Sequence, residues 1–174
     1  MKSNVYILLM AAVLGACGKA EVVTFRDRST VIKADRSTWT ATASSEETVA
    51  EAAGAAMLLD GKIATYWHSD YSVTNPPYPH WIRIDMKTAI KLVSVEITAR
   101  QNNTNAMTKF KLEGSTDGNT WSLMGDNLVF TGATKTPQSY PVSSAVTVRY
   151  LRLTALEGPV KNNFIAEIEA FAGK

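Results

Sequence analysis

His80-Trp-Ile-Arg-Ile-Asp-Met86 alternates apolar and polar side chains with a period of two residues. Successive side chains of a β-strand point to opposite sides of its sheet, so the three apolar residues after Trp81 share one face, opposite Arg83 and Asp85. Val93-Ser-Val-Glu-Ile-Thr-Ala99 repeats this alternation. Both stretches therefore predict strands that bury one face against a hydrophobic core.

Other parts of the chain predict short strands separated by turns. Thr116-Asp-Gly-Asn119 is typical of a hairpin turn, and the prolines of residues 69–79 predict a loop. Residues 49–59, which are rich in alanine and lack proline, predict the one short helix. Further strands are expected at residues 108–113, 121–124, 146–156 and 164–171. Many short strands with so little helix indicate an all-β sandwich or jelly roll.

The first part of the chain predicts export. Residues 1–16 contain one cation and then an apolar run that is too short to span a bilayer, as in a signal peptide. Cys17, the only cysteine, follows Leu-Gly-Ala and resembles the lipobox cysteine of bacterial lipoproteins, whose thiol receives a diacylglycerol. The alternative is a free thiol in a secreted protein. Residues 17–37 are interpreted as a tether that merges into a first edge strand, and residues 38–174 as the domain.

Composition and charge exclude several classes of function. The chain is 45% hydrophobic, which indicates a globular domain, and its formal charge of +2 gives no broad basic surface for nucleic acid. The one adjacent acidic pair, Glu46-Glu47, would point to opposite sides of an extended segment, and no Ser/His/Asp pattern or phosphate-binding loop is visible. We therefore do not expect an enzyme.

Seven segments, in this order, resemble the coagulation factor 5/8 type C, or discoidin, domain, and within it the bacterial family 32 carbohydrate-binding modules. They are Trp39-Thr-Ala-Thr-Ala-Ser-Ser45, Leu59-Asp-Gly61, Thr65-Tyr-Trp-His68, Pro79-His-Trp-Ile-Arg-Ile-Asp85, Ser115-Thr-Asp-Gly118 with Trp121, Arg149-Tyr-Leu-Arg-Leu153 and Ile165-Ala-Glu-Ile168. The resemblance implies a discoidin-like jelly-roll β-sandwich with one short helix, in which Trp67, Trp81 and Trp121 serve packing. Two departures are Met86-Lys87 at a strand end and Ala106, which stands where the family often has glycine beside a ligand-binding asparagine.

The resemblance implies a structural calcium ion, because the family carries a site that ties the loop after the helix to the last strand. Calcium prefers six to eight oxygen ligands. The matching positions are the carbonyls of Met57, Lys62 and Ala166, the carboxylates of Asp60 and Glu167, and the hydroxyl and carbonyl of Thr65. The alternative is that Asp60-Gly61 forms only a turn and that Glu167 is a solvated strand residue.

The resemblance also implies a site for galactose-type sugars. Sugar recognition requires an aromatic face for the C–H side of the ring and fixed polar groups for the hydroxyls. His68 and Arg100 would bind ring hydroxyls, Asn105 would add a hydrogen bond, and Tyr71 would stack on the ring. The opposite wall is expected from Asn162, Asn163 and Phe164.

These expectations combine into a non-catalytic lipoprotein of the bacterial envelope, anchored through Cys17 and placed in the outer membrane. It would bind terminal galactose-type sugars of complex glycans near partner glycosidases or transporters. Two alternatives are a discoidin domain that binds a protein or an anionic phospholipid, and a structural subunit of a surface glycan-utilisation complex.

Overall fold

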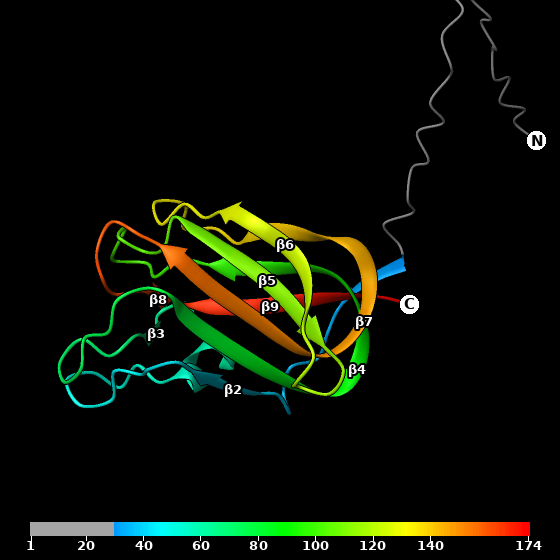
Figure 1. Ribbon diagram of the computed structural model, residues 1–174, viewed down its shortest axis with the longest axis horizontal. Coiled ribbons are helices and arrows are strands. Elements are labelled where there is room, and N and C mark those ends of the chain that lie inside the picture. Colours follow the sequence, from blue (N-terminus) through cyan, green and yellow to red (C-terminus); the bar gives the residue numbers. More distant parts are fainter. Residues whose placement is uncertain (1–29) are drawn as a thin grey trace, which may run out of the picture.

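A computed structural model describes residues 30–174, with side chains for all of these except residues 143–145, and shows an antiparallel β-sandwich (Figure 1). The strands are β1 (Val31–Lys33), β2 (Thr40–Ala43), β3 (Trp67–His68), β4 (His80–Thr98), β5 (Lys109–Ser115), β6 (Ser122–Val129), β7 (Gln138–Glu157), β8 (Phe164–Ile165) and β9 (Glu167–Gly173). One short 3₁₀ helix, η2 (Ala55–Leu59), precedes β3. The expected signal peptide and Cys17 lie outside the described residues.

The two long strands β4 and β7 build both layers of the sandwich. The first part of β4, residues 80–85, pairs with β2 and with the second part of β7, whereas residues 92–98 pair with β9. Register shifts between Asp85 and Ile90, and between Leu92 and Ser94, interrupt the β4 ladder, and Lys87 has a φ of 65° there. Both strands curve strongly where the layers join (Figure 1).

The core lies between the layers and confirms the alternation read from the sequence. Ile82, Ile84 and Met86 are buried, whereas Arg83 and Asp85 on the other face of β4 are only half-buried. The largest fully buried side chains also include Trp67, Phe110, Leu58, Leu92, Ile97, Met107, Leu112, Leu151 and Leu153.

One detail of the expected fold was wrong. The helix expected over residues 49–59 is reduced to η2, because the Glu47 carboxylate accepts the N–H groups of Val49 and Ala50 and the Glu47 backbone forms an isolated bridge with Ala53. The strands expected at residues 80–86 and 93–99 are confirmed, as the two parts of one 19-residue strand. A packing role is confirmed for Trp67 but not for Trp81, whose exposure of 38% places much of the indole in solvent.

Several loops meet at the end of the sandwich that lies away from the C-terminus (Figure 1). The loop between β3 and β4 and the loop between β7 and β8 lie side by side, since Ser69 N–H donates to the Asn163 carbonyl at 2.9 Å. Within residues 30–174, no helix is long and apolar enough to cross a membrane.

Candidate functional site

Asn163 joins three of the loops at this end. Its side-chain Oδ1 accepts the Met107 N–H at 2.9 Å, and its backbone N–H donates to the Ser69 hydroxyl at 3.0 Å. Asn163 is fully buried. It therefore holds the loops in position and has no surface to offer to a ligand.

Glu47 holds the loop that carries Tyr71. Its carboxylate accepts the N–H groups of Tyr71 and Ser72 and the Ser72 hydroxyl, in addition to the two N–H groups that follow Glu47 itself. Burial alone would raise the pKa of Glu47, but the hydrogen bonds from Ala50, Ser72 and Tyr71 lower it to about 2. Glu47 is therefore an ionised, fully buried anchor.

His68, Tyr71 and Phe164 form an aromatic cluster above these anchors. The His68 ring lies parallel to the Phe164 ring at a centroid distance of 5.2 Å and meets the Tyr71 ring edge-on at 4.7 Å. The Arg100 guanidinium completes the cluster, with its Cζ 3.7 Å from the centroid of the Tyr66 ring and 5.4 Å from that of Phe164. Three of the four principal sugar-site residues expected from the sequence thus lie together.

Glu51 links the polar groups of this cluster, which we call the loop-end cluster: Glu51, Tyr66, His68, Tyr71, Arg100 and Phe164. Its carboxylate accepts the Tyr71 hydroxyl at 2.9 Å and also accepts the Tyr66 hydroxyl. One Arg100 nitrogen lies 4.0 Å from the same carboxylate. Burial acts to raise the pKa of Glu51, but both tyrosine hydrogen bonds and the Arg100 charge lower it overall. Glu51 is therefore anionic at neutral pH.

His68 contributes a neutral imidazole. It is only 5% exposed, and its Nδ1 is buried without a hydrogen-bond partner. Burial lowers the pKa of His68, although the Glu51 charge acts in the opposite direction. At neutral pH the ring is uncharged, so one of its nitrogens is a hydrogen-bond donor and the other an acceptor.

Within residues 30–174, Asn105 and Asn162 make no hydrogen bond, ion pair or ring contact with the loop-end cluster. Asn105 is exposed, and its backbone N–H donates to Asn103 Oδ1 at 2.9 Å. The Asn162 carbonyl accepts the Tyr78 hydroxyl, and its side-chain oxygen is buried without a hydrogen bond. Phe164 is 2% exposed, so it supports His68 from below and presents almost no surface.

Lys135 fixes the loop that carries Arg100 and Asn105. Its ammonium group donates to the carbonyls of Arg100, Asn103 and Gly132 at 2.6 to 2.8 Å. The loop conformation therefore depends on a cation from a distant segment, between β6 and β7.

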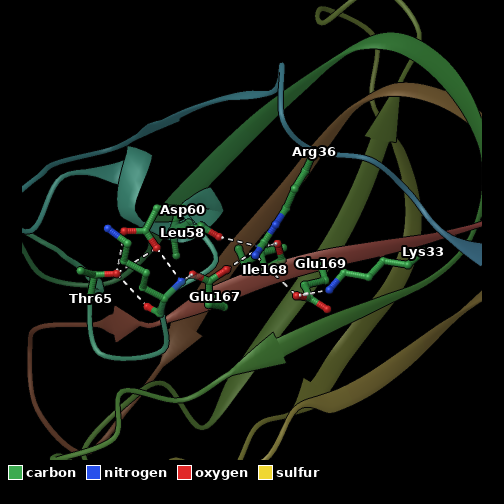
Figure 2. Close-up of polar contacts among 9 residues, drawn as sticks. Lys33, Arg36, Leu58, Asp60, Thr65, Glu167, Ile168 and Glu169 are labelled. Carbon is green, nitrogen blue, oxygen red and sulfur yellow. Dashed lines mark hydrogen bonds and ion pairs between the residues drawn. The ribbon is translucent and has the colours of Figure 1, made fainter.

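Several of the residues expected to bind calcium gather where the segment after η2 meets β9 (Figure 2). The Thr65 hydroxyl lies 2.8 Å from an Asp60 carboxylate oxygen and 2.7 Å from the Lys62 carbonyl. The Lys62 N–H donates to both Asp60 and Glu167, so four of the six expected ligands gather at one place. Met57 lies within η2, and Ala166 lies between β8 and β9.

Arg36 also reaches this cluster. One guanidinium nitrogen lies 2.5 Å from Glu167 Oε2 and donates to the carbonyls of Leu58 and Ile168 (Figure 2). Burial raises the pKa of Glu167 to about 7, although Arg36 acts to lower it. Within the described residues, no three His, Cys, Asp or Glu side chains are grouped so that they could hold a metal ion. The donors gathered here are the two carboxylates of Asp60 and Glu167 together with neutral oxygens of Lys62 and Thr65. That all-oxygen set fits a hard cation, with Arg36 as a fixed neighbour.

Sequence reasoning missed five residues of these two sites: Arg36, Glu47, Glu51, Tyr66 and Lys135. Tyr66 lies inside the quoted segment Thr65-Tyr-Trp-His68, so its position beside His68 was a usable signal. Glu47 was considered only as one of an acidic pair; it is buried while Glu46 is exposed.

Comparison with known proteins identifies the family and supports the fold. The family model for the F5/8 type C domain matches residues 40–170. A sialidase of Micromonospora viridifaciens is 32% identical over 131 residues, which are 72% of this chain and 20% of the sialidase. This chain thus spans about a fifth of that relative.

Two solved structures share the fold at higher coverage. The C-terminal domain of a chitobiase from Bacteroides fragilis is 30% identical, with a TM-score of 0.73 over 82% of this chain and 98% of that one. A family 32 carbohydrate-binding module from Clostridium perfringens, in complex with GalNAc-β-1,3-galactose, is 26% identical, with a TM-score of 0.70 over 77% of this chain and 95% of that one.

Proposed function

The chain belongs to the F5/8 type C domain family, with family 32 carbohydrate-binding modules among its structural neighbours, and from that premise we propose that it binds a galactose-type sugar at the loop-end cluster without catalysing a reaction. The observation that carries this proposal is the meeting of His68, Tyr71 and Arg100 around Glu51. These groups come from loops that are far apart in the sequence.

Each group of the cluster has a role in the proposal. Arg100 is held by Tyr66 and by a 2.8 Å hydrogen bond from its Nε to Asn102, so its remaining N–H groups donate to ring hydroxyls. The neutral His68 imidazole and the Glu51 carboxylate accept hydrogen bonds from sugar hydroxyls. The half-buried Tyr71 ring packs on the C–H face of the sugar. Asn163 and Phe164 support the site from within, and the proposal gives Asn105 and Asn162 no direct contact with the sugar.

One such site binds weakly because a monosaccharide offers few contacts, and a dissociation constant on the order of micromolar to millimolar is expected. Display of many copies on a membrane raises the avidity. We place the protein in the bacterial envelope, acylated at Cys17 and near partner glycosidases or transporters. Detergent-phase partition of the native chain and of Cys17→Ala tests the lipid anchor. Only the native chain should enter the detergent phase.

Calcium is part of this proposal as a structural ion. Asp60, Glu167, the Thr65 hydroxyl and the Lys62 carbonyl would hold it, with the carbonyls of Met57, Thr65 and Ala166 completing the set. It would supply positive charge that fixes the segment after η2 against β9. The gathered oxygens and the burial of Glu167 support this assignment.

Calorimetric titration with galactose, N-acetylgalactosamine and glucose tests the proposed sugar site. Arg100→Ala and Tyr71→Ala should each weaken galactose binding at least about tenfold, because each removes a direct contact. Lys109→Ala is the control, since Lys109 is a surface lysine that pairs with Glu157 and makes no contact with the loop-end cluster. Galactose binding that is unaltered by both loop-end substitutions would rule out the site.

One observation favours a second candidate, binding to a lipid surface. Val49 and Val73 are 77% and 68% exposed, and their two loops are both bound to Glu47 or its neighbours at the same end of the sandwich. Exposed apolar residues at loop tips insert into membrane interfaces. Flotation with phosphatidylserine vesicles that is lost in Val49→Ser/Val73→Ser would establish this role in place of sugar binding.

A further inference from the structure

The outer face of the sheet carries two hollows that share Arg83. One, of about 300 Å³, is lined by Trp81, Arg83, Gly118, Asn119, Trp121 and Arg152. The other, of about 310 Å³, is lined by Thr40, Thr42, Arg83 and Asp85. We call the two together the sheet-face groove. It runs across β2, β4 and β7 and contains no residue of the loop-end cluster.

Arg83 has no anionic partner among the described residues. Its guanidinium instead lies over the Tyr150 ring, whose centroid is 4.9 Å from Arg83 Cζ. The strand register places it directly opposite Arg152 on β7 and Thr42 on β2. Like charges directly opposite one another disfavour strand pairing, and within residues 30–174 only Arg152 of these two arginines has a carboxylate partner, Glu113. An anion bound beside Arg83 would offset this repulsion.

The neighbouring carboxylates are already engaged by other cations. Asp85 forms a two-point ion pair with Arg149, at 2.9 and 3.0 Å, and a further ion pair with Lys87. Glu113 lies 2.9 Å from Arg152 Nε and 3.2 Å from Lys111 Nζ. Two carboxylates therefore pair with four cations, and Arg83 is a fifth cation that has no carboxylate partner in the described part of the chain.

The third carboxylate near the groove, Asp117, lies in the turn between β5 and β6. Its Oδ1 accepts the Ser115 hydroxyl and the N–H groups of Asn119 and Thr120 at 2.8 to 2.9 Å. Asp117 is thus bound to its own turn. The next residue, Gly118, has a φ of +77°, and an added Cβ would lie 3.0 Å from Arg83 Nη2. The turn therefore contacts Arg83 closely without neutralising it.

Aromatic rings flank this free cation. Trp81 is 38% exposed, and Trp121 is half-buried beneath the Arg152 guanidinium, whose Cζ lies 4.1 Å from the ring centroid. Indole surfaces pack on the C–H face of a pyranose ring, and a guanidinium binds a planar carboxylate through two parallel hydrogen bonds. Threonine hydroxyls at positions 40 and 42 add neutral donors and acceptors on the other side of Arg83.

From these observations we propose that the sheet-face groove is a second saccharide site, which binds a carboxylate-bearing sugar through Arg83, with Trp81 packed on the sugar ring. The chemistry is complementary, because the groove offers excess positive charge, an exposed indole and hydroxyl groups. It does not depend on the loop-end cluster and holds whether or not that cluster binds galactose.

The test uses Arg100→Ala as the parent protein, so that the loop-end cluster does not contribute. It is titrated with trigalacturonate, with the fully methyl-esterified trisaccharide and with 3′-sialyllactose, and tryptophan fluorescence is recorded. Trp39 and Trp67 are buried, so a fluorescence change reports on Trp81 and Trp121. At least one of the two acidic oligosaccharides should bind, and the methyl-esterified trisaccharide should bind at least about tenfold more weakly than trigalacturonate. Comparison of trigalacturonate with 3′-sialyllactose shows whether the carboxylate belongs to a uronic acid or to a sialic acid.

The added substitutions Arg83→Ala and Trp81→Ala should each weaken acidic-sugar binding at least about tenfold, with Arg83→Lys intermediate because an ammonium group lacks the planar fork. Lys109→Ala, a surface lysine paired with Glu157, is the matched control and should leave binding unchanged. Thermal melting of every variant confirms folding. Absence of acidic-sugar binding, equal binding of the ester, or indifference to Arg83→Ala would each overturn the proposal.

Discussion

Replacement of Asn163 by alanine tests whether the loops at the sugar-binding end are held together from within. The substitution removes the 2.9 Å hydrogen bond from the Met107 N–H to Asn163 Oδ1. Met107 is fully buried, so its N–H would be left without a partner. Such a loss costs about 1–3 kcal/mol, and the small cavity left by the amide brings the total to about 2–4 kcal/mol.

Urea denaturation of Asn163→Ala and the native protein measures this difference directly. For a domain of this size, a loss of about 3 kcal/mol lowers the melting temperature by roughly 10 °C. Asn162→Ala is the matched control, because Asn162 is half-buried and its side-chain oxygen makes no hydrogen bond. Its unfolding free energy should fall by less than about 1 kcal/mol. Equal losses in the two variants would refute the assignment of Asn163 as an internal anchor.

Three further predictions follow from named contacts. Chelation by EDTA should lower the melting temperature by roughly 5–10 °C in the native protein and by much less in Asp60→Ala. Melting curves of both proteins with and without added calcium measure this difference. Equal shifts in the two proteins would contradict the cation site. The pKa of Glu47 is lowered to about 2 from an ordinary value of 4.5. The ionised Glu47 carboxylate therefore stabilises the folded protein fully above pH 4.5, and this stabilisation is lost as the pH falls through about 2. Melting curves of Glu47→Gln should therefore depend less on pH over that window than those of the native protein, and identical pH profiles would refute this. Lys135→Met should weaken galactose binding several-fold in calorimetry, because it removes the hydrogen bond to the Arg100 carbonyl. Lys109→Met is the control and should leave the affinity unchanged. An unchanged affinity of Lys135→Met would show that Lys135 does not support the site.

The strands could be predicted from the sequence because their signal is local. The alternation around Ile82 and Ile84 is a property of a few adjacent residues, and it survives in β4 as buried and half-buried positions. The alanine-rich stretch of residues 49–59 led to a wrong helix prediction because its signal is local as well. Its helix propensity is also local, but the hydrogen bonds from Val49 and Ala50 to Glu47 compete with it.

The sites could be predicted only in part, because their geometry depends on contacts between distant segments. His68, Tyr71 and Arg100 were found by resemblance to a known family. Arg36 and Lys135 were not found, because their contacts with Glu167 and with the Arg100 carbonyl join distant segments. Such contacts cannot be recognised from the residues adjacent in the sequence. Arg83 was identified only as a polar position in a strand, and its lack of an anionic partner depends on the register of β4 against β7.

The most direct test of sugar binding at the loop-end cluster is a titration of the isotope-labelled protein with galactose, followed by amide chemical shifts. The account predicts that the largest shifts fall at residues 66–72 and 100–105, and that Arg100→Ala abolishes them. Shifts confined to residues 81–83 and 118–121, or no shifts at millimolar galactose, would contradict it.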